Sequence, residues 1–174
     1  YARLENNAGL REAPVAVEAL LGEAGDNARF EAETRAVRVE SNWGSGLFEG
    51  AELLGDGPAL LRAIDNVVRN AIRFTPEGGV LELKAQCHDR TLELLCRDEG
   101  PGVPPEELPD LFRPFVRGKR ESTGTGFGLG LAIAQKCVEG HKGRLEATNR
   151  TDGRTGLVVR FTLPLERSPR KGTF

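Results

Sequence analysis

The pattern of apolar and polar residues along the chain predicts three main helices. Residues 15–36 form the first, because apolar residues recur there at helical spacing. Residues 58–74 form the second, since Pro58 suits a first helical turn and Thr75-Pro76 ends the helix. The third is expected over residues 128–139. The apolar positions are Val15, Ala19, Leu20 and Phe30 in the first helix, and Leu60, Ile64, Val67, Val68 and Ala71 in the second.

Short segments between and after these helices alternate as β-strands do. They are residues 35–40, 46–53, 80–87, 91–98, 144–148 and 156–163. In the fourth of these, Leu92, Leu94 and Cys96 share one face, and Asp98 is next in the same phase. Residues 106–112 are expected to form a short helical turn. Helices and mostly antiparallel strands in this order predict a two-layer α/β (α+β) sandwich, with a mixed sheet covered on one face by the helices.

Charge and cysteine content narrow the classes of protein. The chain has 174 residues, 24 of them Lys or Arg and 26 Asp or Glu, so the formal net charge is -2. This balance gives no reason to expect a nucleic-acid or membrane-surface partner. No apolar run approaches the roughly 20 residues of a bilayer span, and no signal-peptide pattern is present. Cys87, Cys96 and Cys137 lack CxxC spacing, which favours a reducing cytoplasm over a disulfide framework or a cysteine metal site.

The second helix carries a polar face that suits a metal–phosphate ligand. Asn66, Asn70 and Arg73 fall together opposite its core stripe. Amide oxygens are suitable ligands for Mg²⁺, which is a hard cation that keeps several waters. A guanidinium one turn further can bind phosphate oxygens in a fork. The alternative is an ordinary solvated helix face, and these residues alone favour that alternative.

Residues 98–102 form a second candidate site. The inward phase of Asp98 predicts a buried carboxylate, which needs hydrogen-bond donors. An adenine amino group would be such a donor, whereas a guanine carbonyl would be repelled. Gly100 and Gly102 would let the backbone approach a base closely. The alternative is an Asp/Gly/Pro turn with no ligand, and taken by itself the segment favours it.

A third candidate is the glycine-rich run of residues 124–131, which leads into the third helix. Glycines before a helix N-terminus expose N–H groups to phosphate. The spacing matches neither the dinucleotide-binding fingerprint nor a P-loop, and no protein Ser/Thr kinase motif occurs. A flexible linker is a weak alternative, because the glycines alternate with apolar residues.

Together and in this order, the motifs resemble those of bacterial sensor histidine kinases. Residues 65–76 resemble the N box, 98–104 the G1 box, 111–117 the F box, 126–133 the G2 box and 160–164 the last strand. The resemblance extends from about Ala16 to Pro164. It implies the Bergerat ATP-binding fold, with ATP and Mg²⁺ as cofactors and a lid over residues 105–125.

The resemblance also implies roles for individual residues. Asn70 and Asn66 would hold Mg²⁺ and, with Arg73, form the catalytic set; Asp98 would bind the adenine amino group, and Arg117 would reach phosphates. The nucleotide-binding residues implied are Asn66, Asn70, Arg73, Phe74, Asp98, Gly100, Gly102, Val103, Phe115, Arg117, Thr125, Gly126, Phe127, Gly128, Leu129, Gly130 and Leu131.

The same resemblance divides the chain and names its partners. Residues 1–10 would end the preceding dimerisation helix, 11–165 would form the ATP-binding domain, and 166–174 a flexible basic tail. The partners implied are the dimerisation and histidine-phosphotransfer domain of the same protein and, indirectly, a response regulator. We expect a monomeric cytoplasmic domain without membrane contact of its own, whose parent protein lies in the bacterial inner membrane.

Two departures from the family pattern are present, and only the first of them bears on function. No acceptor-histidine segment occurs within the 174 residues, so we expect a fragment without the histidine that it phosphorylates. His88 and His141 lie in predicted turns without a catalytic partner. Lys142 stands where a second glycine is common after His141, which should alter only a turn.

Relatives of the same fold with other functions are the main alternatives. Gyrase, MutL and heat-shock chaperones hydrolyse ATP with a glutamate that activates water; here that position is Asn66, and an amide is no general base. A site that binds phosphates and a metal ion but has no such base suits transfer of the phosphate to an external nucleophile such as imidazole. A pseudokinase or an anti-sigma-type serine kinase stays open as the rival interpretation.

Overall fold

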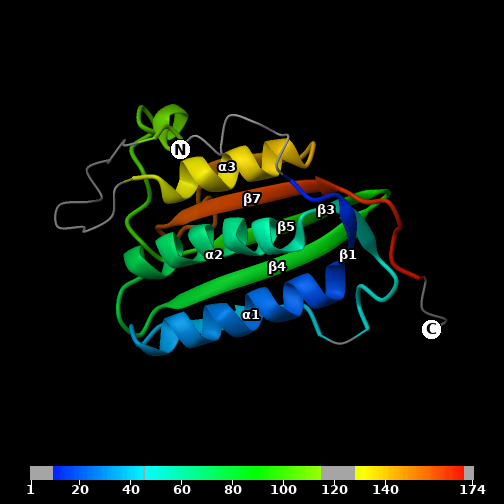
Figure 1. Cartoon of the computed structure of the whole chain (residues 1–174). Helices are drawn as coiled ribbons and strands as arrows, with labels where there is room; N and C mark the ends of the chain where they lie inside the picture. Colours follow the sequence, from blue (N-terminus) through cyan, green and yellow to red (C-terminus); the bar gives the residue numbers. More distant parts are fainter. Residues whose placement is uncertain (1–9, 45, 115–127, 171–174) are drawn as a thin grey trace.

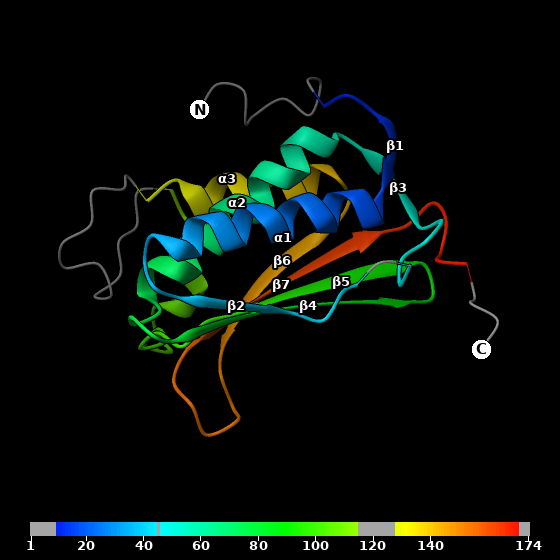
Figure 2. The ribbon, with the colours of Figure 1, turned by 90° about the horizontal axis from the view of Figure 1, so that it is seen from below.

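The computed structural model describes residues 10–44, 46–114 and 128–170, and these form two layers. Three helices lie on one face of a five-stranded sheet (Figure 1). Figure 2 shows the helices all on the same side, and no described helix covers the other face. This arrangement confirms the predicted two-layer α/β sandwich with helices on one face.

The sheet is mixed and mostly antiparallel. Its strands, in spatial order, are β2 (Arg38–Ser41), β4 (Val80–His88), β5 (Thr91–Arg97), β7 (Leu157–Pro164) and β6 (Arg144–Asn149). β2 pairs with β4 in parallel, and the three remaining pairings are antiparallel. All five strands were predicted, with ends that differ slightly from those observed.

The inward-facing positions of the strands form the core together with the helices. Leu81 and Leu83 of β4, like Leu92 and Leu94 of β5, are buried as their alternation predicts. Cys96 continues this face and is fully buried, and burial raises the pKa of its thiol. The helices are therefore held on the sheet by side chains at every second residue.

Helix α2 (Gly57–Phe74) crosses the middle of the sheet and has the predicted core stripe. Asp56 caps its first turn, because the Asp56 carboxylate accepts a hydrogen bond from the Ala59 N–H at 3.0 Å. At the other end, the chain leaves the helix at Thr75, whose hydroxyl donates to the Ala71 carbonyl. The predicted bounds of 58–74 are confirmed within one residue.

The first predicted helix is partly wrong. Residues 13–16 form strand β1 (Ala13–Ala16), which pairs with β3 (Glu52–Gly55) in a separate two-stranded sheet. Helix α1 runs only from Val17 to Glu33. The predicted apolar position Phe30 is 74% exposed. The apolar face of α1 is instead made largely of small residues, which carry a weak periodic signal.

Two further boundaries differ from the sequence prediction. Residues 46–50 form turns before β3 and do not begin a strand, and Phe48 in these turns is buried. Helix α3 is Gly130–Gly140, so it starts two residues later than expected from 128–139. Gly128 has a φ of 68°, which is incompatible with a right-handed helix.

The predicted flexible tail is paired with the domain as far as the structure describes it. The backbone of Arg167 pairs with Glu52 of β3, and the Arg170 N–H donates to the Glu49 carbonyl at 2.8 Å. Arg167 therefore bridges to the edge of the small sheet and Arg170 is held by the turn before β3, while residues 171–174 lie outside the described ranges. Across the ranges that are described, no helix has both the length and the apolar character to cross a membrane.

Candidate functional site

Asp98 is a buried carboxylate directly after the last residue of β5. Its side chain and backbone together are 1% exposed. Its Oδ1 accepts hydrogen bonds from the backbone N–H groups of Gly100 and Leu157, both at 2.9 Å. Donors of this kind offset the cost of burying a charge. The inward orientation predicted from the strand phase is confirmed, and the carboxylate is fixed by the protein itself.

The glycines that follow Asp98 bring this loop close to neighbouring segments. A Cβ at Gly100 would lie 2.9 Å from the Phe74 carbonyl oxygen at the end of α2. Gly102 has a φ of 75°, and a Cβ there would lie 2.8 Å from Asn149 Oδ1. Both positions therefore require glycine, one because of a close approach and the other because of its left-handed backbone.

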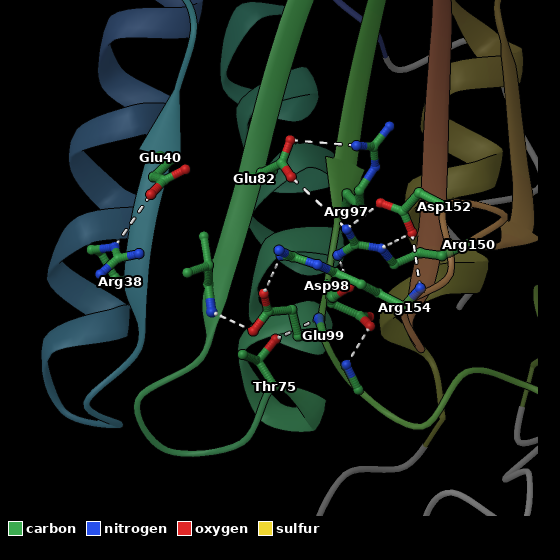
Figure 3. Close-up of polar contacts among 12 residues, drawn as sticks. Arg38, Glu40, Thr75, Glu82, Arg97, Asp98, Glu99, Arg150, Asp152 and Arg154 are labelled. Carbon is green, nitrogen blue, oxygen red and sulfur yellow. Dashed lines mark hydrogen bonds and ion pairs between the residues drawn. The ribbon is translucent and has the colours of Figure 1, made fainter.

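A second set of hydrogen bonds ties the loop to the end of α2 and to the start of β4. The Glu99 carboxylate accepts from the Val80 N–H at 3.0 Å, and the Glu99 N–H donates to the Thr75 hydroxyl at 3.4 Å. These contacts are drawn in Figure 3. They hold the end of β5 beside the last turn of α2, where Arg73 and Phe74 lie.

The polar face predicted on α2 is present and partly buried. Asn66, Asn70, Arg73 and Phe74 are all half-buried, between the buried core stripe and solvent. The Arg73 guanidinium carbon lies 5.7 Å from the centre of the Phe74 ring, within the range of a cation–π contact. Two amide oxygens and a guanidinium thus share one side of the helix, a donor set that suits Mg²⁺ and phosphate oxygens.

The start of α3 lies against this face. A Cβ at Gly130 would be 3.8 Å from the Asn66 Cβ, so the first residue of α3 is adjacent to the middle of α2. Gly128, Leu129 and Leu131 are half-buried around it. Predicted site residues Phe115, Arg117, Thr125, Gly126 and Phe127 lie outside the described residues, as does most of the predicted lid.

The end of β6 supplies site contacts that sequence reasoning missed. The Asn149 side-chain amide donates to the Val103 carbonyl at 2.6 Å and accepts from the Val103 N–H at 2.8 Å. Arg150 donates from its guanidinium to the Asp98 carbonyl at 3.0 Å. A signal for Asn149 existed, because it follows Leu145 and Ala147 in the inward phase of its strand. Arg150 follows the last residue of the strand and carried no such signal.

Opposite charges surround Arg150 (Figure 3). Its guanidinium lies 2.6 Å from an Asp152 carboxylate oxygen and 4.0 Å from a Glu82 oxygen. The hydrogen bond from Arg150 holds the pKa of Asp152 well below its usual range, and the same bond raises the pKa of Arg150. On the helix side, desolvation by burial raises the pKa of Asp65, beside Asn66, although the bond from Asn27 opposes this shift.

Neither histidine is placed for catalysis. His88 is exposed at the end of β4, and it pairs with Thr91 at the opposite end of β5 from Asp98. His141 is buried; its Nε2 accepts from the Asp56 N–H at 2.9 Å, so its Nδ1 carries the proton and donates to the Cys137 carbonyl at 2.7 Å. His141 therefore joins the end of α3 to the start of α2. The next residue, Lys142, has a φ of 60°, a conformation that glycine adopts more easily.

A separate groove of about 430 Å³ lies beside the edge strand β6. It is lined by the 3-10 helix Leu108–Asp110 and Phe112 on one side and by residues of β6 and β7 on the other. None of the predicted site residues lines it. The buried carboxylate and the polar face of α2 are therefore stronger indications of the functional site than this groove.

The chain matches a known family of ATP-binding domains. The family model, described as histidine kinase-, DNA gyrase B- and HSP90-like ATPase, matches residues 55–167. Signal transduction histidine-protein kinase BaeS of Escherichia coli is 35% identical over 90% of this chain and 33% of BaeS. Sensor protein CutS of Streptomyces coelicolor is 37% identical over 87% of this chain and 36% of CutS. The chain spans about a third of the length of these relatives.

Solved structures show the same fold. The mycobacterial sensor histidine kinase MprB has a TM-score of 0.76 at 27% identity, over 91% of this chain and 100% of that one. Full-length ShkA in complex with AMPPNP has a TM-score of 0.79 at 27% identity, over 97% of this chain and 34% of that one. The chain belongs to the histidine kinase-, gyrase B- and HSP90-like ATPase family, as a catalytic domain of the sensor histidine kinase type.

Proposed function

We propose that the chain binds Mg²⁺-ATP and donates the γ-phosphate to a histidine on the dimerisation domain of its parent sensor kinase. The observation that carries the proposal is the buried Asp98 carboxylate, which is followed by two obligatory glycines and faces the helical layer. The sensor histidine kinases among the relatives support it, as does the AMPPNP complex of ShkA.

The adenine base would be recognised at Asp98. An ionised carboxylate has about four acceptor sites, so an adenine amino group could donate to it alongside the N–H groups of Gly100 and Leu157. Guanine places a carbonyl oxygen where adenine has the amino group, and two acceptors repel each other. Because Gly100 and Gly102 add no side chain, Asp98 and Val103 could form a wall close to the base.

The phosphates and the metal would lie along α2. Asn66 and Asn70 offer amide oxygens of the type that Mg²⁺ accepts, and Mg²⁺ would neutralise phosphate charge where it binds. Arg73, one turn beyond Asn70, would bind phosphate oxygens. The N–H groups at the start of α3, next to Asn66, would add donors with the favourable end of the helix dipole.

The nucleophile would come from outside the chain. Asn66 cannot take a proton from water, so this position offers hydrolysis no general base. A neutral imidazole nitrogen needs no base to attack, and positioning with charge neutralisation suffices for phosphoryl transfer. The dimerisation domain of the same protein would supply that imidazole, and a response regulator would receive the phosphate from it.

A thermal melt with nucleotides tests the proposal. Mg²⁺-ATP should raise the melting temperature of the 174-residue chain, and Mg²⁺-GTP at the same concentration should raise it much less. Asp98→Asn should weaken ATP binding about tenfold or more, since a hydrogen bond to a charged group is worth about 1.5–3 kcal/mol. Asp89→Asn, in the exposed turn after β4, is the matched control and should bind like the wild type. Equal stabilisation by the two nucleotides would contradict the adenine site.

A further inference from the structure

Two consecutive residues at the end of β6 hold both ends of the loop that carries Asp98. Asn149 binds the N–H and the carbonyl of Val103 with one side-chain amide. Arg150 binds the carbonyl of Asp98 at 3.0 Å. The segment 98–103, including both of its obligatory glycines, is thus fixed at its two ends by residues at the end of β6, which is separated from β5 by β7.

Arg150 reaches Asp98 from the side of the sheet away from the helices. Its partner Glu82 lies on that open face, because Leu81 and Leu83 on either side of it are buried under the helices. The loop between β6 and β7 also extends to that side (Figure 2). The Asp98 carboxylate is held by the N–H groups of Gly100 and Leu157, and its carbonyl oxygen is held separately by Arg150.

The guanidinium has little freedom to leave this position. Its side chain is 2% exposed, and Nε and one terminal nitrogen bind the two oxygens of Asp152 at 3.1 and 2.6 Å. The Arg150 N–H also donates to the Gly156 carbonyl at 2.9 Å, which closes the loop. A methyl group at Gly156 would overlap the Asp98 carbonyl oxygen and crowd the Arg150 side chain. Glycine at 156 therefore leaves room for the contact between Arg150 and Asp98.

We propose that Arg150 is a positioning residue for nucleotide-base recognition, acting through the backbone of Asp98. By fixing the carbonyl of Asp98, it fixes the peptide plane that precedes Glu99 and Gly100, and the Gly100 N–H orients the carboxylate. This inference rests on the proposed role of Asp98 in binding adenine. Under this proposal, the affinity for the base depends in part on the loop between β6 and β7. That loop lies on the side of the sheet away from the helices (Figure 2), and therefore away from the phosphate site proposed on α2.

Arg150→Gln is the direct test, because it keeps a polar side chain but cannot bridge Asp98 and Asp152. Its Mg²⁺-ATP affinity should fall by up to about tenfold, because a displaced Asp98 carboxylate would lose most of its charge-assisted hydrogen bond with the adenine amino group. Its affinity for Mg²⁺-tripolyphosphate, which has no base, should stay within about twofold of the wild type. Calorimetry measures both. An equal loss for the two ligands would mean that Arg150 supports the fold only, and would overturn the proposal.

Arg97→Gln is the matched control. Arg97 pairs with the same Glu82 carboxylate, at 3.5 Å, from the open face of β5. The variant removes an arginine from the same charge cluster while the Arg150–Asp98 contact stays, so both affinities should match the wild type. A fall in ATP affinity equal to that of Arg150→Gln would assign the effect to the charge cluster and overturn the proposal.

A second measurement needs no ligand. The N–H groups of Gly100 and Leu157 bind Asp98 Oδ1, so their hydrogen exchange reports how firmly the carboxylate is held. Exchange at both amides should be faster in Arg150→Gln than in the wild type and unchanged in Arg97→Gln. Unchanged exchange in Arg150→Gln would contradict the positioning role.

Arg150→Lys covers the case in which Arg150→Gln does not fold. Lysine keeps the charge beside Asp152, but one ammonium cannot reproduce the fork of a guanidinium. Its ATP affinity should lie between those of the wild type and Arg150→Gln, and wild-type affinity would overturn the proposal. The wild type and Asp98→Asn are measured first: if they bind ATP equally, the adenine site has failed, whatever Arg150 does.

Discussion

The side chains of Asp98 and Asn149 face the inside of the protein, and both bind backbone groups there. Each accepts a backbone N–H of the 98–103 loop, at 2.9 and 2.8 Å. Buried polar groups with satisfied hydrogen bonds fix one geometry, because every alternative leaves a donor or acceptor unpaired. At this scale the site is preorganised: the residues proposed to meet the base are held by protein contacts.

Asn70 offers the sharpest test at the residue scale. Asn70→Ala should leave the fold intact, because the residue lies outside the buried stripe of α2. It should remove most of the gain in ATP affinity that Mg²⁺ gives, since one of the proposed oxygen ligands is lost. Calorimetry with and without Mg²⁺ measures this gain. Arg69→Ala, on the exposed surface of the same helix, should keep it. A wild-type gain in Asn70→Ala would exclude Asn70 as a ligand.

Among the elements, α2 and α3 are aligned by contacts at both ends of their interface. His141 joins the end of α3 to Asp56 before α2, and Gly130 at the start of α3 lies against Asn66. The position of the glycine-rich start of α3 relative to the polar face of α2 is therefore coupled to a hydrogen bond remote from the site. A shift of one helix along the other would break that bond.

Gly55→Ala tests how tightly this junction is packed. The added methyl group would overlap the His141 imidazole, so we expect a loss of about 1–3 kcal/mol in the free energy of unfolding, as for other overpacked sites. Gly22→Ala, on the exposed surface of α1 with no atom within 4 Å, is the control and should stabilise by up to about 1 kcal/mol. Urea denaturation measures both. Equal stability of the two variants would show that the junction yields to the methyl group.

How well each element could be predicted depends on the strength of its periodic signal. The second helix has bulky apolar residues at helical spacing and clear ends, and its prediction is confirmed to within one residue. The first helix buries small residues such as Ala24, Ala28 and Ala32, which add little to the apolar periodicity. The bulky but exposed Phe30 was therefore wrongly assigned to the buried face. The burial of Asp98 followed from strand phase. The contacts of Arg150 with Asp98 and of His141 with Asp56 could not be found in this way, because the two residues of each pair are distant along the chain.

At the scale of the whole molecule, the two faces of the sheet carry different kinds of residues. The helix-covered face brings Asp98, the polar side of α2 and the start of α3 into one region. The open face carries pairs of opposite charge, such as Arg97 with Glu82 and Arg160 with Glu93. Ion pairs at a protein surface usually contribute little to stability. Arg150 is the described residue through which the open face contacts the backbone of Asp98.

The last prediction concerns what the chain can phosphorylate. Its histidines are His88 and His141. His88 lies at the far end of β5 from Asp98, and both ring nitrogens of His141 are engaged in hydrogen bonds. The chain should therefore bind Mg²⁺-ATP without labelling itself, and should hydrolyse it slowly because Asn66 offers water no base.

The dimerisation hairpin of the parent protein, supplied as a separate chain, should become labelled slowly. Transfer is weak in that mixture because the covalent linkage that gives a high effective concentration is absent. Labelled ATP followed by acid and alkali treatment measures the outcome, since phosphohistidine is labile in acid and stable in alkali. A hairpin whose acceptor histidine is replaced by alanine is the control and should stay unlabelled. An acid-labile, alkali-stable label on the 174-residue chain itself would mean that His88 or His141 reaches the γ-phosphate, against the geometry of both.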